Sequence, residues 1–334
     1  MAAAGYDIDE SAARLATYFH VLRELVHGTA GRLALEPRVE VKSALGDHLH
    51  DDARTVAKLA GRLAELGEPD PRAPGGELAA LLDAADPYAV LKPRLIAAVR
   101  DHLVGLDPIA DEPSLRLLTQ LLHRQERHVA ELPPAGAGVD PRPLPLATGG
   151  PARELRVLAP LDEPARDAYV TVGPEADPPA TLPLDPEEQR RGFHALMHAA
   201  LCDAELAART SHEHPGMPLA FHADMARRCW DGIRHAEAFD QLMAAELGCR
   251  WGDHPVGFGR FRTRYARDLA GRLASPPPLA AIAPDPVAWR GSDARRALVE
   301  RGQERIARVL DHLVADSAGR VQDGDRWGTH PLAS

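Results

Sequence analysis

The sequence predicts an all-α fold, a helical bundle built from two pseudo-repeated halves with a long Pro/Gly-rich crossover. Three observations predict it. Of 334 residues, 45% are hydrophobic and only 4% aromatic, and the abundance of alanine, leucine and arginine favours helix over sheet. Apolar residues recur at three- and four-residue steps over long stretches. The same order of helices occurs twice along the chain.

The first half contains four expected helices. Pro37 interrupts the first periodic stretch because proline lacks a backbone N–H, and Gly67 follows the second, as glycine commonly does at a helix C-terminus. Pro93 is expected to start or kink the third helix. The predicted helices are residues 9–35, 39–66, 88–106 and 114–132.

Helical periodicity resumes at residue 186 after a segment of different composition. Residues 133–185 are dense in proline and glycine, and we expect a connector that crosses the bundle. Within it, residues 154–160 and 168–172 fit either short strands or an ordered crossover. Further helices are predicted at residues 186–214, 220–247, 261–273 and 292–315, followed by a polar, frayed tail.

The two helical segments carry similar residues at nearly constant offsets. Asp51 precedes Asp231 by 180 positions, Arg54 precedes Arg234 by 180, and Glu24 precedes Glu205 by 181. This agreement predicts an internal duplication; the alternative is a chance match between helices of similar composition. The predicted domains are a first helical repeat over 9–132, the connector over 133–185 and a second helical repeat over 186–316.

Charge and cysteine usage exclude several classes of partner. The formal net charge is −10, which argues against nucleic acid and anionic membranes because both attract basic surfaces. The three cysteines, Cys202, Cys229 and Cys249, have no CxxC spacing and suggest buried thiols in a reducing compartment. No signal peptide is visible, and no apolar stretch approaches the roughly 20 residues that span a bilayer. We therefore expect a soluble, cytoplasmic protein.

A repeated helix pair can direct carboxylates from both copies into one central volume. Di-iron carboxylate bundles use this geometry, with a Glu on one helix and Glu-x-x-His on its neighbour, twice over. The i, i+3 spacing places both ligands on one helix face. The corresponding positions here are Glu24, Asp52 and Thr55 in the first half and Glu205, Gly232 and His235 in the second.

Two segments carry a family resemblance. EPRVEVKSALGDHLHDDA and HPGMPLAFHADMARRCWDGIRHAE resemble a little-characterised group of bacterial ferritin-like proteins, whose second motif reads like MARxxWDExRH. The resemblance covers both helix pairs, about half of the chain, and is most specific from Met225 to His235. It implies a ferritin-like fold and, for intact members, a carboxylate/His metal centre.

The ligand set is degenerate relative to that family. Gly232 stands where the resemblance implies a bridging Glu, and Thr55 where it implies the first His. Neither residue replaces a hard, anionic ligand. Four candidate metal ligands remain, namely Glu24, Asp52, Glu205 and His235. They suit one iron or manganese ion, and a protein without metal is an almost equal alternative.

Two functions stay open, both with a small-molecule substrate as partner. One is an enzyme that uses a remodelled iron or manganese site as an oxygenase in specialised metabolism. The other is a metal-free descendant that binds or transforms a small molecule by acid/base chemistry through Glu205, His235 and Asp52, or a non-catalytic binding protein. Homodimer formation is left open.

Several of these positions have a plain structural interpretation. Asp52 lies in an acidic pair typical of an exposed helix face, and His48 and His50 are expected at the surface or beside the site. His235 has Asp231 one turn away, as in an ordinary helical ion pair.

Overall fold

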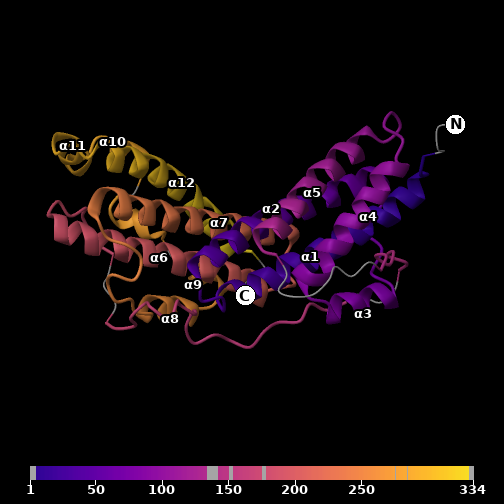
Figure 1. The fold of residues 1–334 in the computed structure, drawn as a ribbon, viewed down its shortest axis with the longest axis horizontal. Helices are drawn as coiled ribbons and strands as arrows, with labels where there is room; N and C mark the ends of the chain where they lie inside the picture. Colours follow the sequence, from indigo (N-terminus) through magenta and orange to yellow (C-terminus); the bar gives the residue numbers. More distant parts are fainter. Residues whose placement is uncertain are drawn as a thin grey trace. The chain divides into compact units, whose positions relative to one another are not determined.

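The computed structural model describes residues 5–133, 142–149, 153–174, 178–274, 276–283 and 285–330, and these residues form an all-helical fold (Figure 1). The all-α prediction is confirmed. No strand forms within the described ranges, where the only β contact is an isolated bridge between Val172 and Val256. Residues 154–160 and 168–172 therefore lie in an extended crossover without a strand ladder.

The chain divides into two compact units. Unit 1 comprises Met1–Ala30 and Asp47–Val157, and unit 2 comprises Gly31–Gly46 and Leu158–Ser334. The later boundary falls inside the predicted connector. The turn between the first two helices, with the helix ends that flank it, belongs to unit 2.

Unit 1 is built from α1 to α5. Buried leucines on α1, α2, α4 and α5, including Leu15, Leu59, Leu95 and Leu118, form its core, and the Tyr18 hydroxyl donates a hydrogen bond of 2.9 Å to the Ala98 carbonyl. The elements are α1 (Ile8–Leu33), α2 (Val39–Glu65), α3 (Gly76–Ala84), the π-helix η1 (Pro87–Leu91), α4 (Lys92–Gly105) and α5 (Glu112–Glu131). The end of α1, from residue 31, and the start of α2, up to residue 46, belong to unit 2.

Local sequence explains the helix ends in unit 1. Gly67, with φ of 87°, follows α2 in the left-handed conformation that glycine adopts without strain. The Asp86 carboxylate accepts hydrogen bonds from the N–H groups of Tyr88 and Ala89 at the start of η1. Pro93 then occupies the first turn of α4, so the prediction that it starts this helix is confirmed.

Unit 2 is organised around the long α6–α7 hairpin. After α7, a π-helix ends at Gly248, which has φ of 63°. The elements are α6 (Pro186–Glu213), α7 (Leu219–Leu242), η2 (Met243–Leu247), α8 (Gly259–Tyr265), α9 (Leu269–Leu273), the short 3-10 helix η3 (Pro278–Ala281), α10 (Pro286–Arg290), α11 (Asp293–Glu300) and α12 (Glu304–Gly328).

Two predicted helices of unit 2 are each divided in the structure. The stretch 261–273 forms α8 and α9, because Asp268 accepts a hydrogen bond from the N–H of Gly271 and starts a new helix. The stretch 292–315 forms α11 and α12, separated by Gly302 with φ of 77°. The prediction of a frayed tail after 316 is wrong, since α12 continues to Gly328 and buries Trp327.

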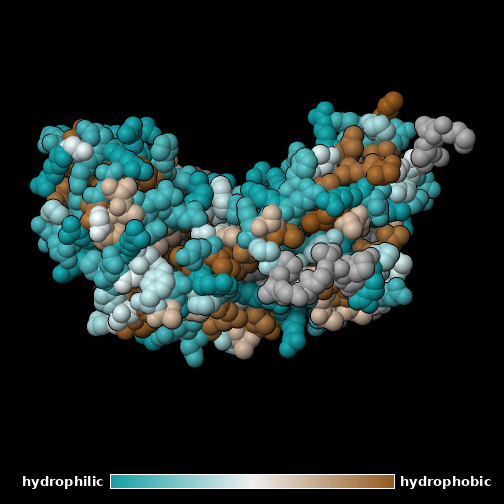
Figure 2. Space-filling view, viewed as in Figure 1, coloured by the Kyte–Doolittle hydropathy of each residue, from teal (hydrophilic) through white to brown (hydrophobic). Residues whose placement is uncertain are grey.

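Figure 2 shows mainly hydrophilic residues on the visible face, with hydrophobic residues exposed in small, scattered groups. Among the residues described, no helix combines the length and apolar character needed to cross a bilayer.

Candidate functional site

The four predicted ligands each have their own partners in the structure. In unit 1, Glu24 pairs with Arg153 and Asp52 with Lys92. In unit 2, Glu205 pairs with Lys42 and Arg166, and His235 lies beside Asp316. Within the described part of the chain, no group of three or more His, Cys, Asp or Glu side chains is arranged to hold a metal ion.

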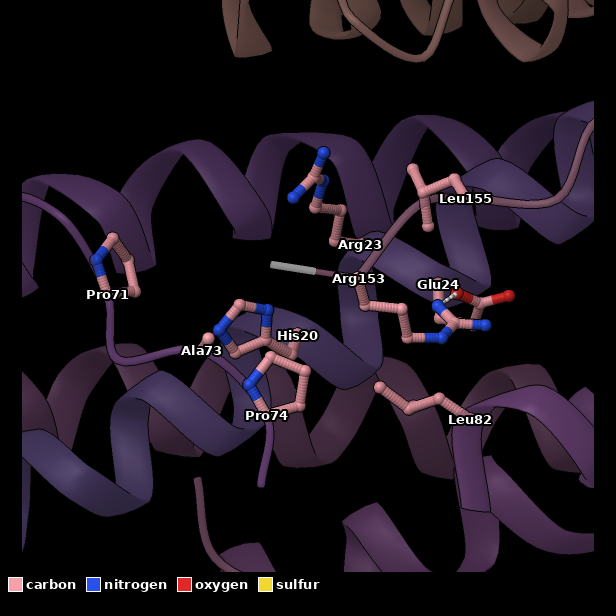
Figure 3. Close-up of a pocket in the computed structure, with 9 residues that line it drawn as sticks. All are labelled: His20, Arg23, Glu24, Pro71, Ala73, Pro74, Leu82, Arg153 and Leu155. Atoms are coloured by element: carbon pink, nitrogen blue, oxygen red, sulfur yellow. Dashed lines mark hydrogen bonds and ion pairs between the residues drawn. The ribbon is translucent and has the colours of Figure 1, made fainter. Parts of the chain in front are cut away.

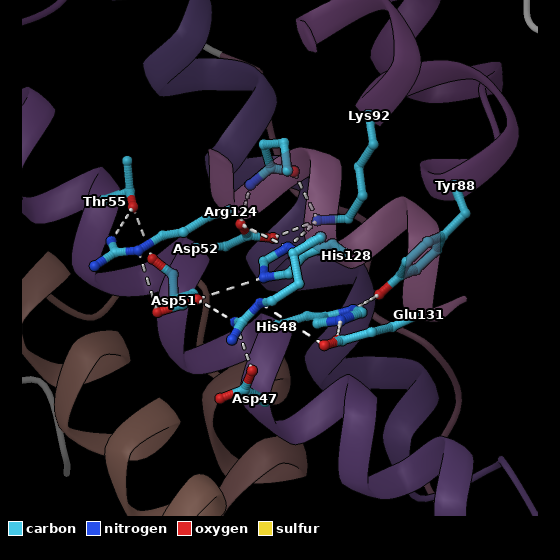
Figure 4. A network of polar contacts seen from close by, with 12 residues as sticks. Asp47, His48, Asp51, Asp52, Thr55, Tyr88, Lys92, Arg124, His128 and Glu131 are labelled. Atoms are coloured by element: carbon cyan, nitrogen blue, oxygen red, sulfur yellow. Dashed lines mark hydrogen bonds and ion pairs between the residues drawn. The ribbon is translucent and has the colours of Figure 1, made fainter. Parts of the chain in front are cut away.

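A buried ammonium group occupies the centre of the Asp52 cluster (Figure 4). Lys92 Nζ donates hydrogen bonds to Asp52 Oδ2 at 2.9 Å, Gln125 Oε1 at 2.9 Å and His128 Nδ1 at 3.0 Å. These three acceptors satisfy all three N–H groups of the ammonium. Lys92 is 0% exposed, and burial lowers its pKa while the Asp52 charge opposes that shift. Lys92 supplies the positive charge that a metal ion would supply to these acceptors.

Two histidines, His48 and His128, belong to this cluster. His48 and His50 were expected at the surface or beside the site; both are buried, and His48 lies beside the site. The rings of His48 and His128 stack with centroids 3.8 Å apart. Burial, followed by the electrostatic influence of His128, Lys92 and Arg127, lowers the pKa of His48 to about 2. The neutral ring donates from Nε2 to Glu131 at 2.8 Å and accepts at Nδ1 from the Tyr88 hydroxyl at 2.7 Å.

The structure explains why threonine stands at position 55, where the family resemblance implies a histidine. Its Oγ1 donates to the Asp51 carbonyl at 2.8 Å and accepts from Arg124 Nη1 at 3.2 Å. The hydroxyl is therefore part of a structural contact between α2 and α5. Asp52, which was expected to be exposed, is 1% exposed on the same helix.

Glu205 is held by two cations in unit 2. Arg166 binds it as a fork, with Nη1 at 2.6 Å from Oε1 and Nη2 at 2.9 Å from Oε2. Lys42 Nζ contacts Oε1 and also donates to the Ala165 carbonyl at 2.9 Å. Glu205 and Lys42 are both 0% exposed, so this carboxylate is saturated by protein donors.

Close helix packing explains the departure at Gly232. A Cβ atom at this position would lie 2.9 Å from both the Ala200 carbonyl oxygen and the Ala204 Cβ of α6. A glutamate therefore has no room there without moving the helix backbone. One turn on, His235 is 1% exposed with Nε2 3.8 Å from Asp316 Oδ2, and His235 and Arg234 lower the pKa of Asp316 to about 2. Asp231, the partner predicted for His235, pairs with Arg227 and Arg234.

Glu24 lies beside a cavity of about 180 Å³ in unit 1 (Figure 3). Arg153 pairs with both Glu24 and Asp83. Arg23 also lines the cavity, and among the residues described it has no hydrogen-bond or ion-pair partner. Burial lowers its pKa while the neighbouring Glu24 charge opposes that shift; a guanidinium nevertheless stays protonated. The remaining wall is largely apolar, formed by Pro71, Ala73, Pro74, Leu82 and Leu155.

His20 contributes a defined polar group to the same cavity. Its Nε2 lies 2.8 Å from the Arg72 carbonyl oxygen, and because a carbonyl only accepts, Nε2 carries the proton. Burial lowers the pKa of His20, so the neutral ring has a lone pair at Nδ1.

Sequence reasoning missed the cations that define these clusters. The chain has only three lysines, and two of them, Lys42 and Lys92, are buried against predicted ligands. The rarity of lysine in an arginine-rich chain was the available signal, but it does not separate these two from Lys58, which is exposed. Arg153 and Arg166 come from the predicted connector, where no periodicity indicated a role.

Comparison with known proteins identifies no relative, because no family model, curated protein or solved structure matches the chain. Whether these residues can bind a metal ion is therefore judged from the arrangement of their side chains alone. The side chains as arranged do not form a ligand set for iron or manganese, because each of the three carboxylates is already neutralised by lysine or arginine.

Proposed function

We propose that this protein is a metal-free descendant of the ferritin-like bundle proteins that binds a small organic carboxylate in the unit 1 cavity. The observation that carries the proposal is Arg23, a half-buried guanidinium beside a cavity that, among the described residues, feels the charge of Glu24 but forms no hydrogen bond or ion pair. A buried charge without a partner is unfavourable. A ligand carboxylate would supply the missing partner.

The charge and shape of the cavity favour this ligand class. Two guanidinium groups, Arg23 and Arg153, line it; Arg153 is paired with the carboxylates of Glu24 and Asp83, which leaves Arg23 as the guanidinium without a hydrogen-bonded carboxylate. Guanidinium groups match a carboxylate geometrically as well as electrostatically. A volume of about 180 Å³ is close to that of a dry cavity that accepts a benzene ring, about 150 Å³. The apolar wall then contacts a compact hydrocarbon body.

The cation pairing of Asp52 and Glu205 supports a role without metal. A lysine ammonium at each carboxylate stabilises it inside the bundle and removes the charge that would attract a metal ion. Gly232 and Thr55 fit the same history, because both positions now serve packing or structural hydrogen bonds.

Local geometry supports descent by internal duplication. The α1–α2 and α6–α7 connections lie at the same relative position, with α1 ending at Leu33 and α6 at Glu213. Offsets of 180 positions at Asp51/Asp231 become 181 at Gly67/Gly248. The π-helix η2 lies just before Gly248, and a π turn accommodates one additional residue. A one-residue insertion in the second copy accounts for this change, and the offset of 181 at Glu24/Glu205 requires a second one-residue difference earlier in the hairpin.

Benzoate titration by calorimetry tests the proposal. We expect saturable binding, weakened about ten- to a hundredfold by Arg23→Gln, because a hydrogen bond to a charged group contributes about 1.5–3 kcal/mol. Arg54→Gln, at an exposed position of α2 in the same unit, is the matched control and should leave the affinity unchanged. Benzamide, which lacks the charge, should bind more weakly than benzoate.

Two outcomes decide against the proposal. Failure of both benzoate and acetate to bind saturably would exclude a carboxylate site, and equal affinity in Arg23→Gln would exclude this cavity. Treatment of the protein with a chelator before titration tests the metal-free part separately. Loss of binding after chelation, restored by iron or manganese, would favour the metal-dependent alternative.

A further inference from the structure

His20 gives the unit 1 cavity a hydrogen-bond acceptor to which the proposed function assigns no ligand group. Its Nε2 donates to the Arg72 carbonyl oxygen at 2.8 Å, so the other ring nitrogen, Nδ1, carries the lone pair. Among the described residues, no donor is bound to Nδ1. The half-buried ring lines the cavity and, in the view of Figure 3, lies between Pro74 and Arg23. The cavity therefore offers an acceptor as well as a guanidinium without a hydrogen-bonded carboxylate.

The surroundings of His20 keep its ring neutral and select a neutral donor. Burial lowers the pKa of His20, and the positive charges of Arg23 and Arg153 lower it further, against the opposing effect of the hydrogen bond to the Arg72 carbonyl. Both charges that act on the ring are positive. A hydroxyl group therefore suits Nδ1 better than an ammonium group, which these charges would repel.

The spacing of the two ligand-binding groups limits the shape of the ligand. His20 and Arg23 are three residues apart on α1, so their side chains lie on the same helix face with Cβ atoms about 5–6 Å apart. A ligand that reaches both must carry its carboxylate and its donor on separate parts of one body. The cavity of about 180 Å³, with Pro71, Pro74 and Leu82 in its wall, has room for a body of the size of a benzene ring.

We infer that the ligand of this cavity is an aromatic carboxylate with a hydroxyl group at the meta or para position of its ring. The carboxylate binds Arg23, and the hydroxyl donates to His20 Nδ1. This inference rests on the proposed function, because it assumes that the cavity binds a carboxylate. A ligand without the hydroxyl covers Nδ1 and leaves the acceptor without a donor, which lowers the affinity. His20 is then the residue that distinguishes hydroxylated from plain aromatic carboxylates.

Calorimetric titration with a series of benzoates tests the inference on the unmodified protein. We expect 3- or 4-hydroxybenzoate to bind about three- to tenfold more tightly than benzoate, which is the effect of one hydrogen bond between neutral groups. The methylbenzoate substituted at the same ring position is the matched ligand control, because a methyl group is similar in size to a hydroxyl and has no donor. Equal or tighter binding of the methyl compound would overturn the inference.

The isomer 2-hydroxybenzoate tests the spacing. Its hydroxyl lies next to the carboxylate and cannot reach His20 while the carboxylate binds Arg23, so it should gain nothing over benzoate. If this isomer gave the largest gain of the three, the inference would be wrong.

His20→Phe tests the role of the ring nitrogen, because phenylalanine keeps an aromatic ring and lacks the acceptor. The ratio of hydroxybenzoate affinity to benzoate affinity should fall to about one in this variant. His123→Phe, at an exposed position of α5 in the same unit, is the matched control and should keep the ratio of the unmodified protein. An unchanged ratio in folded His20→Phe contradicts the inference, and the ligand series decides the question alone if the variant does not fold.

Failure of the inference is distinguishable from failure of the proposed function. Saturable benzoate binding that is weakened in Arg23→Gln, with no preference for a hydroxyl, overturns the inference and leaves the carboxylate site intact. Absence of saturable binding by benzoate and by all three hydroxybenzoates overturns both.

Discussion

The two units stabilise a buried carboxylate in different ways. In unit 1, Asp52 faces one cation, Lys92, whose remaining donors bind the neutral acceptors Gln125 and His128. In unit 2, Glu205 faces two cations, Lys42 and Arg166. The first arrangement is balanced in charge, whereas the second has an excess positive charge. A buried carboxylate is therefore paired with one cation in unit 1 and with two in unit 2.

The largest expected effect is on the balanced cluster. Lys92→Met leaves the Asp52 carboxylate buried without a cation and should lower the free energy of unfolding of unit 1 by about 3–5 kcal/mol. Lys42→Met leaves Arg166 on Glu205, so the loss in unit 2 should be smaller, about 1.5–3 kcal/mol. Urea denaturation monitored by hydrogen exchange in each unit measures both values.

Lys58→Met is the control for these substitutions, since Lys58 is exposed and binds only Gln120. Adding Asp52→Leu to Lys92→Met should recover much of the lost stability, because the unpaired charge is removed. An equal loss for Lys92→Met and Lys42→Met would contradict the difference drawn between the two clusters.

Substitution of one helical glycine in each unit tests how closely neighbouring elements pack against that helix. Gly232→Ala places a Cβ 2.9 Å from backbone and side-chain atoms of α6 and should destabilise unit 2 by about 1–3 kcal/mol. Gly61→Ala, on α2 with nothing within 4 Å of its Cβ, should stabilise unit 1 by about 0.5–1 kcal/mol. Thermal unfolding of the two variants shows whether each substitution lowers or raises the stability. Stabilisation by Gly232→Ala would show that α6 and α7 pack less closely than the structure indicates.

A further difference between the units is expected in the pH dependence of stability. The pKa of His48 is lowered to about 2, and burial with His254 lowers that of His194 in unit 2 to about 4. Between these values and the unfolded pKa of about 6.5, the unfolded chain binds a proton that the folded chain does not. Stability therefore falls as the pH drops below about 6.5, by up to about 1.4 kcal/mol per pH unit for each histidine.

Substitution of each histidine separates the two contributions. His48→Gln should reduce the dependence of the free energy of unfolding on pH in unit 1, at every pH below 6.5 that can be reached. His194→Gln should reduce it in unit 2 only between about pH 4 and 6.5. Urea titrations at pH 7, 6, 5 and 4 measure the slopes. If neither variant changes the slope below pH 6.5, the buried histidines are not the cause of acid sensitivity.

Long amphipathic helices could be predicted from the sequence because their burial depends on a local period. The bounds of α1, α2, α6 and α7 follow the predicted stretches to within a few residues at most ends. Breaks inside helices, as at Gly302 and Asp268, were missed because an apolar period continues across them. Helix α3 was not predicted, since nine residues show little periodicity.

The residue types of the candidate site were predictable, and their partners were not. The sequence by itself determined an all-helical chain with acids at Glu24, Asp52 and Glu205 on its long helices. Only the tertiary structure decided that Lys92, Lys42, Arg153 and Arg166 neutralise them, because each pair joins residues at least 39 positions apart. Periodicity reports which face of a helix is buried, but the charge of that buried face depends on which distant segments pack against it.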